Sequence, residues 1–437
     1  MHTLAAGAAS IDISPRDSQF LYGYPHVERH STGIHDPLLS SALYLCDGQT
    51  EIMFIANDII FVSKATAQKT RQRITEATSV PGGSIMITAT HTHSGPKTAD
   101  YISNENDPNV PPVDPGYLQI FEDGIVDAAV KAHGRARRAQ VGLALADCAG
   151  VGTNRRDPSG PADCTVPVLM VKAADDGSNI ACMVVYSMHP TVLHEDSRLV
   201  SGDFPAMTRQ YLQEAVLGED CPVLYHTGPE GNQSPRHVTQ ENTFAEAKRL
   251  GHLLGREIAG ALPRIQYRSS LEVRSVRRFL DLPRRRFPPL PEAEEKVKLA
   301  REKLDHLRRT HAPRQEVRTA EVDWFGAEET LTLAQAAQRG RLEPYYQMCL
   351  PAEVQVLKIG PWAFVGWPGE MFIEFSLAIK EKARDTYVIA LANGELQGYI
   401  VTEEAALEGG YEASNTILDP ASGEMLVATT LELLGTV

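Results

Sequence analysis

The 437-residue sequence lacks long apolar runs and an excess of basic residues, and both absences exclude classes of protein. No apolar run approaches the ~20 residues that a membrane-spanning helix needs, so we expect no membrane anchor. Acidic residues outnumber basic ones by 56 to 42, and the formal charge is −14. A surface for nucleic acid depends on clustered lysine and arginine, so we expect no nucleic-acid partner.

Cysteine is scarce and unpatterned. The six cysteines are scattered, with no CxxC motif, which indicates reduced thiols rather than a disulfide framework. The first residues also lack the basic start and the apolar stretch of a signal peptide. We therefore expect a cytoplasmic protein. The alternative is an exported protein whose signal has been removed.

What the sequence does contain is a regular alternation of short apolar strands and helical segments. The hairpins expected around Asp47-Gly48, Asp175-Asp176-Gly177 and Gly360-Pro361 would supply antiparallel pairs. Helices are expected over residues 64–78, 115–133 and 243–261. The length allows one large domain or two smaller ones. We expect an α/β fold, with residues 1–437 forming a single large domain of mixed β-sheets flanked by helices.

Residues 283–341 differ in composition from the rest. The segment starts with a proline-rich, basic stretch and then becomes strongly charged. Helices are expected over residues 291–310, where one apolar stripe is present, and over residues 328–338. A single stripe can cover a neighbour on one side only. We expect an inserted, solvated helical hairpin that borders a substrate entrance or a subunit interface in a homo-oligomer, rather than a part of the core.

Two histidines stand where a buried strand ends. The strand expected over residues 84–90 leads into His91-Thr92-His93. If the strand continues, the two imidazoles lie on one face, because residues two apart in a strand point to the same side. Ligand sites of α/β sheets form at such ends. The pair suits zinc, or one metal ligand beside one proton carrier.

Other polar residues also follow expected strands. His189 comes after a second apolar strand and is followed by a proline. Glu370 follows a strand and a Pro-Gly turn, and Tyr411 follows two glycines that permit close backbone approach. Residues 228–235, GPEGNQSP, contain neither a nucleophile elbow nor a Ser-His-Asp order, and alone would be an ordinary polar turn.

Taken together in chain order, the motifs resemble the neutral ceramidase family. The resemblance extends over residues 7 to about 415. It rests on GAASIDISP (7–15), GIHDPL (33–38), THTHSGP (90–96), TNR (153–155), MHPT (188–191), SRLVSGD (197–203), GNQSP (231–235), WPGE (367–370) and GYEAS (410–414). Each motif alone is unspecific, whereas the complete ordered set is specific.

The resemblance implies one zinc ion and assigns its ligands. By correspondence of motifs, the metal ligands are His91, His189, Glu370 and Tyr411. The same correspondence makes His93 a catalytic proton carrier. Arg155 and Ser234 line the site as further catalytic residues. Whether Ser234 attacks the substrate or stabilises an oxyanion stays open.

The implied reaction is cleavage of the C–N bond of a small-molecule amide by metal-activated water. The chain ends about 26 residues after Tyr411, so we expect a short member without the family's C-terminal β-sandwich. Asn232 and Arg236 also depart from the family pattern. We therefore expect an N-acyl substrate less lipid-like than ceramide, with room for an anionic group near Arg155 and Arg236. An esterase or lactonase using the same site, or a non-catalytic binding protein, are the alternatives.

Overall fold

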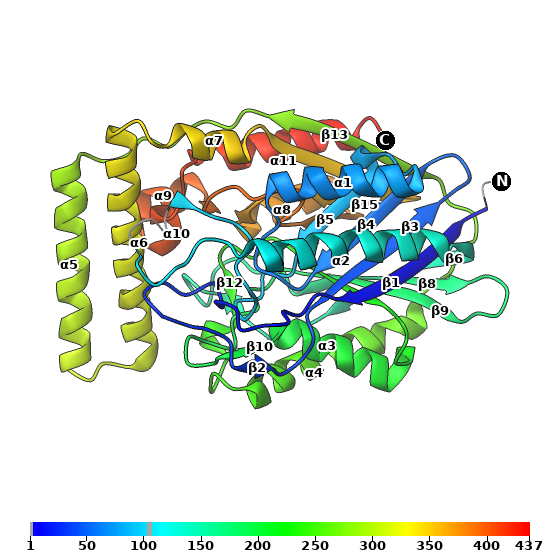
Figure 1. Ribbon diagram of the computed structural model, residues 1–437, viewed down its shortest axis with the longest axis horizontal. Helices are drawn as coiled ribbons and strands as arrows, with labels where there is room; N and C mark the ends of the chain where they lie inside the picture. Colours follow the sequence, from blue (N-terminus) through cyan, green and yellow to red (C-terminus); the bar gives the residue numbers. More distant parts are fainter. Residues whose placement is uncertain (1–2, 103–106) are drawn as a thin grey trace.

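Two β-sheets packed face to face form the centre of the computed structural model, which describes residues 3–102 and 107–437 (Figure 1). The larger sheet has the strand order β11-β9-β8-β6-β1-β3-β4-β5, and the smaller has β13-β14-β15-β17. The strands of the larger sheet are β1 (Ala5–Asp12), β3 (Leu39–Cys46), β4 (Glu51–Asn57), β5 (Ile85–Ala89), β6 (Arg137–Asp147), β8 (Thr165–Ala173), β9 (Asn179–Tyr186) and β11 (Val223–Thr227). Those of the smaller sheet are β13 (Val273–Leu280), β14 (Ala352–Ile359), β15 (Trp362–Gly366) and β17 (Thr386–Ile389).

The alternation of side chains along each strand explains why the two sheets pack together. In β3, Leu43 and Leu45 lie between the sheets, while the intervening Tyr44 packs on the opposite face. In β14, Leu357 lies between the sheets and Val356 lies on the outer face. Because the side-chain period of a strand is two, an apolar strand covers a core on each side. The expected hairpins are present as β3–β4, β8–β9 and β14–β15.

Helices cover both outer faces and complete four layers. Side chains of α1 (Lys64–Thr78) and α2 (Pro115–Gly134) pack on one part of the larger sheet. Those of α3 (Asp203–Leu212) and α4 (Phe244–Ala261) pack on another part. The smaller sheet is covered by α8 (Ile373–Lys382) and α11 (Ala421–Leu434). The expected α/β fold with mixed sheets flanked by helices is confirmed. Within the described residues, no helix has both the length and the apolar character needed to cross a bilayer.

The larger sheet is curved so that its two edge strands meet. The Thr88 hydroxyl of β5 lies 2.8 Å from Nδ1 of His226 in β11. One residue further on, the Thr227 hydroxyl donates to the carbonyl oxygen of Thr90 at 2.8 Å. These bonds hold the carboxyl ends of β5 and β11 together, and β9 runs parallel to β11. The segments that follow β5, β9 and β11 therefore begin next to one another, at the carboxyl ends of these strands.

A helical hairpin, α5 (Leu290–Arg309) and α6 (Arg314–Gln338), forms one end of the molecule, on the left in Figure 1. We expected its second helix to begin at residue 328, but α6 begins at Arg314. The charges in the extra turns weaken the apolar pattern there, although Ala320 and Val322 are buried. Their charged side chains pair with α5, Arg308 with Glu321 and Lys303 with Asp323.

We had expected the whole hairpin to lie outside the core, and this was wrong for its second helix. Leu333 and Ala336 of α6 are fully buried in the cluster that covers the smaller sheet. By contrast, Leu299 of α5 is 54% exposed. The outer helix is therefore solvated and the inner helix is part of the packed molecule.

The remaining short strands and α-helices on the described chain are β2 (Gly33–Ile34), β7 (Thr153–Asn154), β10 (Leu199–Val200), β12 (Gln233–Ser234), β16 (Glu370–Met371), β18 (Tyr399–Ile400), α7 (Glu343–Cys349), α9 (Glu403–Glu408) and α10 (Tyr411–Ser414).

Candidate metal centre

His91 is placed by a turn, and the strand does not continue through it as we expected. Strand β5 ends at Ala89, and His91 has a φ of 68°, in the left-handed region. Its amide donates to the carbonyl of Ile59 at 2.9 Å, which holds this strained conformation. Its ring Nδ1 lies 3.0 Å from the carbonyl oxygen of Ile60. A carbonyl can only accept, so Nδ1 carries the proton and Nε2 presents a lone pair.

The other two predicted histidines have the same arrangement. Nδ1 of His189 lies 2.8 Å from the carbonyl oxygen of Glu230, and Nδ1 of His93 lies 3.1 Å from that of Gly23. Each ring therefore presents Nε2 to the same small space. The His91 ring is 4.8 Å from His93 and 4.9 Å from His189, centre to centre. Backbone carbonyls behind metal-binding imidazoles orient ligands in this way.

Two buried carboxylates face these imidazoles. Oε2 of Glu370 lies 3.0 Å from Nε2 of His189 and 3.4 Å from Nε2 of His91. Glu370 comes from β16, which pairs in parallel with β18 after the turn at Gly369. The second carboxylate, Glu230, is fully buried, and neither of its oxygens has a hydrogen-bond partner among the described residues. Ligand atoms of His91, His189, Glu230 and Glu370 all lie within 4.8 Å of one another.

The pKa directions of these groups follow from crowding and burial. Burial and the charge of Glu370 raise the pKa of Glu230 well above its usual value. For Glu370 burial acts in the same direction, but the imidazoles of His91 and His189 outweigh it and hold the pKa well below normal. Burial also lowers the pKa of His189 to about 4, which keeps the ring neutral. Neutral imidazoles beside carboxylates are a donor set for a divalent cation such as zinc.

Tyr411 reaches the same region from α10. Gly409 and Gly410 precede it with φ values of 79° and 91°, so the glycines permit the turn as expected. A Cβ at Gly410 would lie 3.1 Å from Nη1 of Arg156. The Tyr411 ring packs 5.7 Å from that of Tyr399, and its hydroxyl accepts from Nδ2 of Asn415 at 3.3 Å.

A two-strand ladder brings Arg155 and Ser234 together. Ser234 of β12 pairs with Thr153 of β7, and Arg155 follows β7 directly. The Arg155 amide donates to the carbonyl of Asn232 at 2.7 Å. Its Nε lies 2.7 Å from Oε1 of Glu412. The Ser234 hydroxyl accepts from the amide of Arg236 at 3.1 Å and, like Arg155 and His93, borders a cavity beside the imidazoles.

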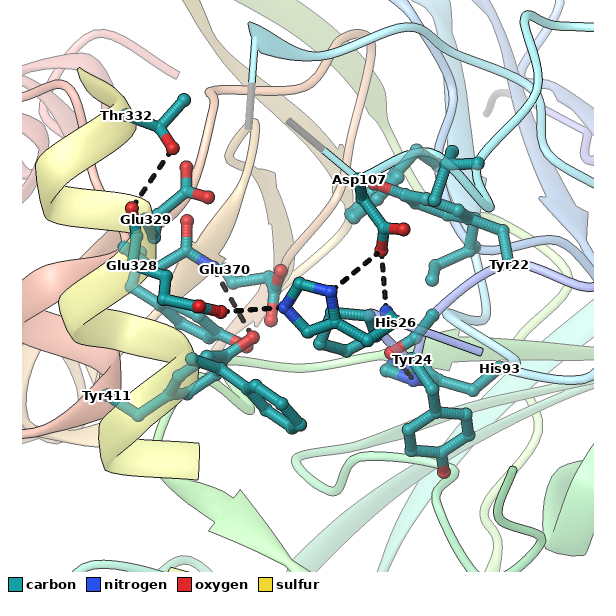
Figure 2. A pocket seen from close by; sticks show the side chains of 18 of the residues that line it. Tyr22, Tyr24, His26, His93, Asp107, Glu328, Glu329, Thr332, Glu370 and Tyr411 are labelled. Carbon is teal, nitrogen blue, oxygen red and sulfur yellow. Dashed lines mark hydrogen bonds and ion pairs between the residues drawn. The ribbon is translucent and has the colours of Figure 1, made fainter. Parts of the chain in front are cut away.

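A larger cavity of about 270 Å³ opens from the cluster toward α6. Figure 2 shows Glu328, Glu329 and Thr332 of α6 facing it. Across the cavity, Nε2 of His26 lies 2.7 Å from Oε2 of Glu328, and the His26 amide donates to Asp107 at 2.5 Å. The hairpin helix α6 is thus tied to the N-terminal part of the chain at the wall of this cavity. That the segment borders a substrate entrance or a subunit interface stays a prediction.

Six of the seven residues predicted from the sequence line these two cavities, and the seventh, His189, lies behind them in contact with Glu370. His91, His189 and Glu370 form one buried cluster with His93 beside it, and Tyr411, Arg155 and Ser234 border the cavities. Sequence reasoning missed Glu230, which lies in the stretch that we took for an ordinary polar turn. Its signal was available, because it follows the end of β11 by three residues, as His189 follows the end of β9.

The chain is similar to known proteins of one family. Residues 5–222 match the model of the N-terminal region of neutral/alkaline non-lysosomal ceramidases. The neutral ceramidase of Mycobacterium tuberculosis is 24% identical over 238 residues, which are 50% of this chain and 37% of that protein. The chain thus spans little more than a third of this curated relative.

Solved structures share the fold. The neutral ceramidase of Pseudomonas aeruginosa superposes with a TM-score of 0.76 at 18% identity, over 100% of this chain and 75% of that one. A ceramidase complexed with C2 superposes with a TM-score of 0.74 at 17% identity, over 98% of this chain and 74% of that one. With the matched N-terminal half and the ordered motifs, these findings show that the chain belongs to the neutral/alkaline non-lysosomal ceramidase family.

Proposed function

We propose that this chain is a zinc-dependent hydrolase that cleaves the C–N bond of an N-acyl amide. The carrying observation is the convergence of His91 and His189 with the carboxylates of Glu230 and Glu370 on one buried space beside a cavity, with His93 next to both histidines. The relatives are named ceramidases, and ceramide is an amide, which supports the same class of reaction. A panel of amides that includes ceramide is the direct test of the substrate.

The residues present fit a zinc ion. Nε2 of His91 is buried without a hydrogen-bond partner among the described residues, as are both oxygens of Glu230. Such orphaned atoms are costly unless a ligand satisfies them. We propose His91, His189, Glu370 and Tyr411 as the ligands. When bound, zinc acts as a Lewis acid and lowers the pKa of a water molecule toward neutrality.

The remaining residues have roles that follow from their positions. Arg155 and Ser234 line the space next to the cluster and would donate hydrogen bonds to the carbonyl oxygen as it gains negative charge. In the overall reaction the oxygen of water bonds to the carbonyl carbon, the C–N bond breaks, and the nitrogen takes a proton. Burial and the neighbouring His91 and His189 lower the pKa of His93 well below normal, so its ring starts neutral with Nε2 free to accept. His93 would take one proton from the attacking water and pass it to the departing nitrogen.

The test is the metal content and activity of His189→Ala. The variant should lose most of its zinc, measured by elemental analysis of the purified protein, and its amidase activity. His252→Ala is the matched control, because His252 lies on α4 and its ring packs on Tyr211, away from the cluster. Wild-type zinc content in His189→Ala would overturn the ligand assignment. Zinc-loaded wild-type protein that cleaves no amide in the panel would overturn the function.

A further inference from the structure

A second cavity lies beside the proposed catalytic residues and is lined by three arginines. Its volume is about 70 Å³, and Arg155, Arg236 and Arg318 border it together with His93 and Ser234. We call it the arginine cavity. No aspartate or glutamate is among the described residues that line it. It shares His93, Tyr399 and Tyr411 with the larger cavity, so one molecule can extend from one cavity into the other past the imidazoles.

The positive charge in the arginine cavity is incompletely compensated. Arg318 is neutralised by two carboxylates, Glu195 at 3.1 Å and Glu321 at 2.6 Å. Arg155 forms an ion pair with one carboxylate, that of Glu412. The Arg236 guanidinium makes no hydrogen bond and no ion pair with any residue that the structure describes. Nη2 of Arg155, whose side chain is only 6% exposed, is buried and also has no hydrogen-bond partner among these residues.

An arrangement of this kind is electrostatically unfavourable without an anion. Burial and the nearby charge of Arg155 lower the pKa of Arg236, but only to about 10, so the side chain stays charged at neutral pH. Arg236 is partly buried, and charges held away from water in proteins are normally paired. Glu412 attracts Arg236 without touching it, and so does Asp323 of α6. The unused donors therefore await a partner with oxygen acceptors.

The chemistry of the donors indicates the kind of partner. A guanidinium is planar and matches the two oxygens of a carboxylate or of a phosphate group. A cavity of about 70 Å³ takes such a compact group and not a long chain. The larger cavity has apolar side chains in its wall, among them Ile60, Phe61 and Leu331, and is the natural place for an acyl chain.

We propose that the arginine cavity binds an anionic group on the amine side of the substrate, and that Arg236 determines this specificity. The substrate class is then an N-acyl amine that carries a carboxylate or a phosphate a few bonds from the amide nitrogen, such as an N-acyl amino acid. This inference rests on the proposed amide hydrolysis and adds the substrate class to it. Arg318 comes from α6, so the hairpin contributes to the same subsite.

The kinetic test uses matched pairs of amides that differ in charge. N-decanoylglycine is compared with N-decanoylglycinamide, and the phosphate ester of N-decanoylethanolamine with N-decanoylethanolamine. The wild-type protein should prefer the anionic member of at least one pair in kcat/KM by about tenfold or more, the usual value of a charged hydrogen bond. The pair with the larger ratio shows whether the anion is a carboxylate or a phosphate. Arg236→Gln should bring this ratio close to one, and Arg236→Lys should restore part of it.

The control variant is Arg301→Gln. Arg301 lies on α5, stacks over the ring of Trp324 and does not line the arginine cavity. Its replacement removes the same charge from the molecule and should keep the ratio of the wild-type protein. A ratio near one in the wild-type protein, or a ratio that Arg236→Gln and Arg301→Gln change equally, would overturn the subsite.

A binding measurement separates this inference from the proposed function. Two probes are compared. One is the ketone analogue of N-decanoylglycine, in which a methylene group replaces the amide nitrogen, and the other is the neutral carboxamide of the same ketone. In calorimetric titrations of the purified full chain, the carboxylate should bind more tightly, and Arg236→Gln should raise its Kd about tenfold. If no amide is cleaved but this preference holds, the function fails and the subsite stands. If amides are cleaved and charge has no effect on binding, the subsite alone fails.

Discussion

Each of the three clustered histidines has its Nδ1 held by a backbone carbonyl, so all three have the same tautomer. The carbonyls belong to Ile60, Gly23 and Glu230, from three separate loops. Such a tautomer is required of a neutral imidazole that binds a metal through Nε2. Geometry alone therefore does not distinguish a ligand from a proton carrier here, and His91, His93 and His189 also form a three-histidine group. Substitution does distinguish them.

His93→Ala should keep the metal and lose turnover. If His93 only carries a proton, the ligands stay in place and elemental analysis should give the zinc content of the wild-type protein. Turnover of an amide should fall by roughly 10²- to 10⁴-fold, the usual contribution of a general acid or base. If the variant loses its zinc together with its activity, His93 is a ligand and the assignment of roles is wrong.

A partly buried carboxyl on α6, that of Glu329 in the wall of the larger cavity, should make stability depend on pH. Burial raises the pKa of Glu329 to about 8, and Oε1 has no hydrogen-bond partner among the described residues. In the unfolded chain the carboxyl ionises near its ordinary value of 4.5. Because the folded-state pKa is the higher one, this group makes folding less favourable as the pH rises from about 4.5 to about 8. Above that range the penalty is complete.

Glu329→Gln removes the penalty, and its benefit should appear only at high pH. We expect the free energy of unfolding to rise by roughly 1–3 kcal/mol at about pH 8.5 and to change little at about pH 5. Urea titrations at both values measure the difference. Glu316→Gln, at the exposed start of α6, is the control and should be neutral at both. An equal gain at both pH values would show that ionisation of Glu329 is not the cause.

The residues of the site could be predicted to different degrees. His91, His189 and Glu370 were predictable because each follows a strongly apolar strand, and the ends of strands meet at one edge. That His91 and His93 share a face of a strand was wrong, because the left-handed turn at His91 depends on a distant backbone partner, Ile59. Glu230 was missed because its surroundings read as a polar turn; its position three residues after β11 was the available signal, whereas its burial depends on segments remote in sequence.

At the scale of elements, one close contact connects the hairpin to the proposed ligand Tyr411. A Cβ placed on Gly326 of α6 would lie 3.0 Å from Cα of Tyr411 and 2.9 Å from Cβ of Ser414. Helix α6 therefore packs on α10 at a distance that only glycine allows. The contact of α6 with α10 was not predictable from the sequence, because a glycine in a helix does not indicate which neighbour will approach it. The burial of Leu333 and Ala336 in the core likewise depends on the smaller sheet.

Gly326→Ala should separate the two helices. Alanine favours a helix over glycine by about 1 kcal/mol, whereas overpacking costs about 1–3 kcal/mol, so we expect a net loss of stability. Activity should fall as well, since Tyr411 would move. Gly260→Ala in α4 is the matched control, because nothing lies within 4 Å of its new Cβ, and it should be neutral or stabilising in the same urea titration. Two variants with equal stability would contradict the close contact.

At the scale of the whole molecule, the proposed ligands come from segments that are far apart in the chain. His91 follows β5, His189 follows β9, and Glu370 and Tyr411 come from the C-terminal part. The curvature of the larger sheet brings the first two together, and the pairing of β16 with β18 adds the third. The order of strands in the sheets could not be predicted from the sequence, because apolar patterns identify strands but not their neighbours.

Because the ligands converge only in the folded chain, the metal should stabilise the whole molecule. An ion that binds the folded state alone contributes about 2.7 kcal/mol at a free concentration 100 times its Kd. Treatment with a chelator should lower the Tm, and added Zn²⁺ should restore it in a concentration-dependent manner. The His189→Ala variant should show neither effect, since it lacks a ligand, and Mg²⁺ should not replace Zn²⁺, because it prefers six oxygen ligands. If the chelator leaves the Tm unchanged, or if His189→Ala responds to Zn²⁺ as the wild-type protein does, the ion is not held by residues that converge on folding.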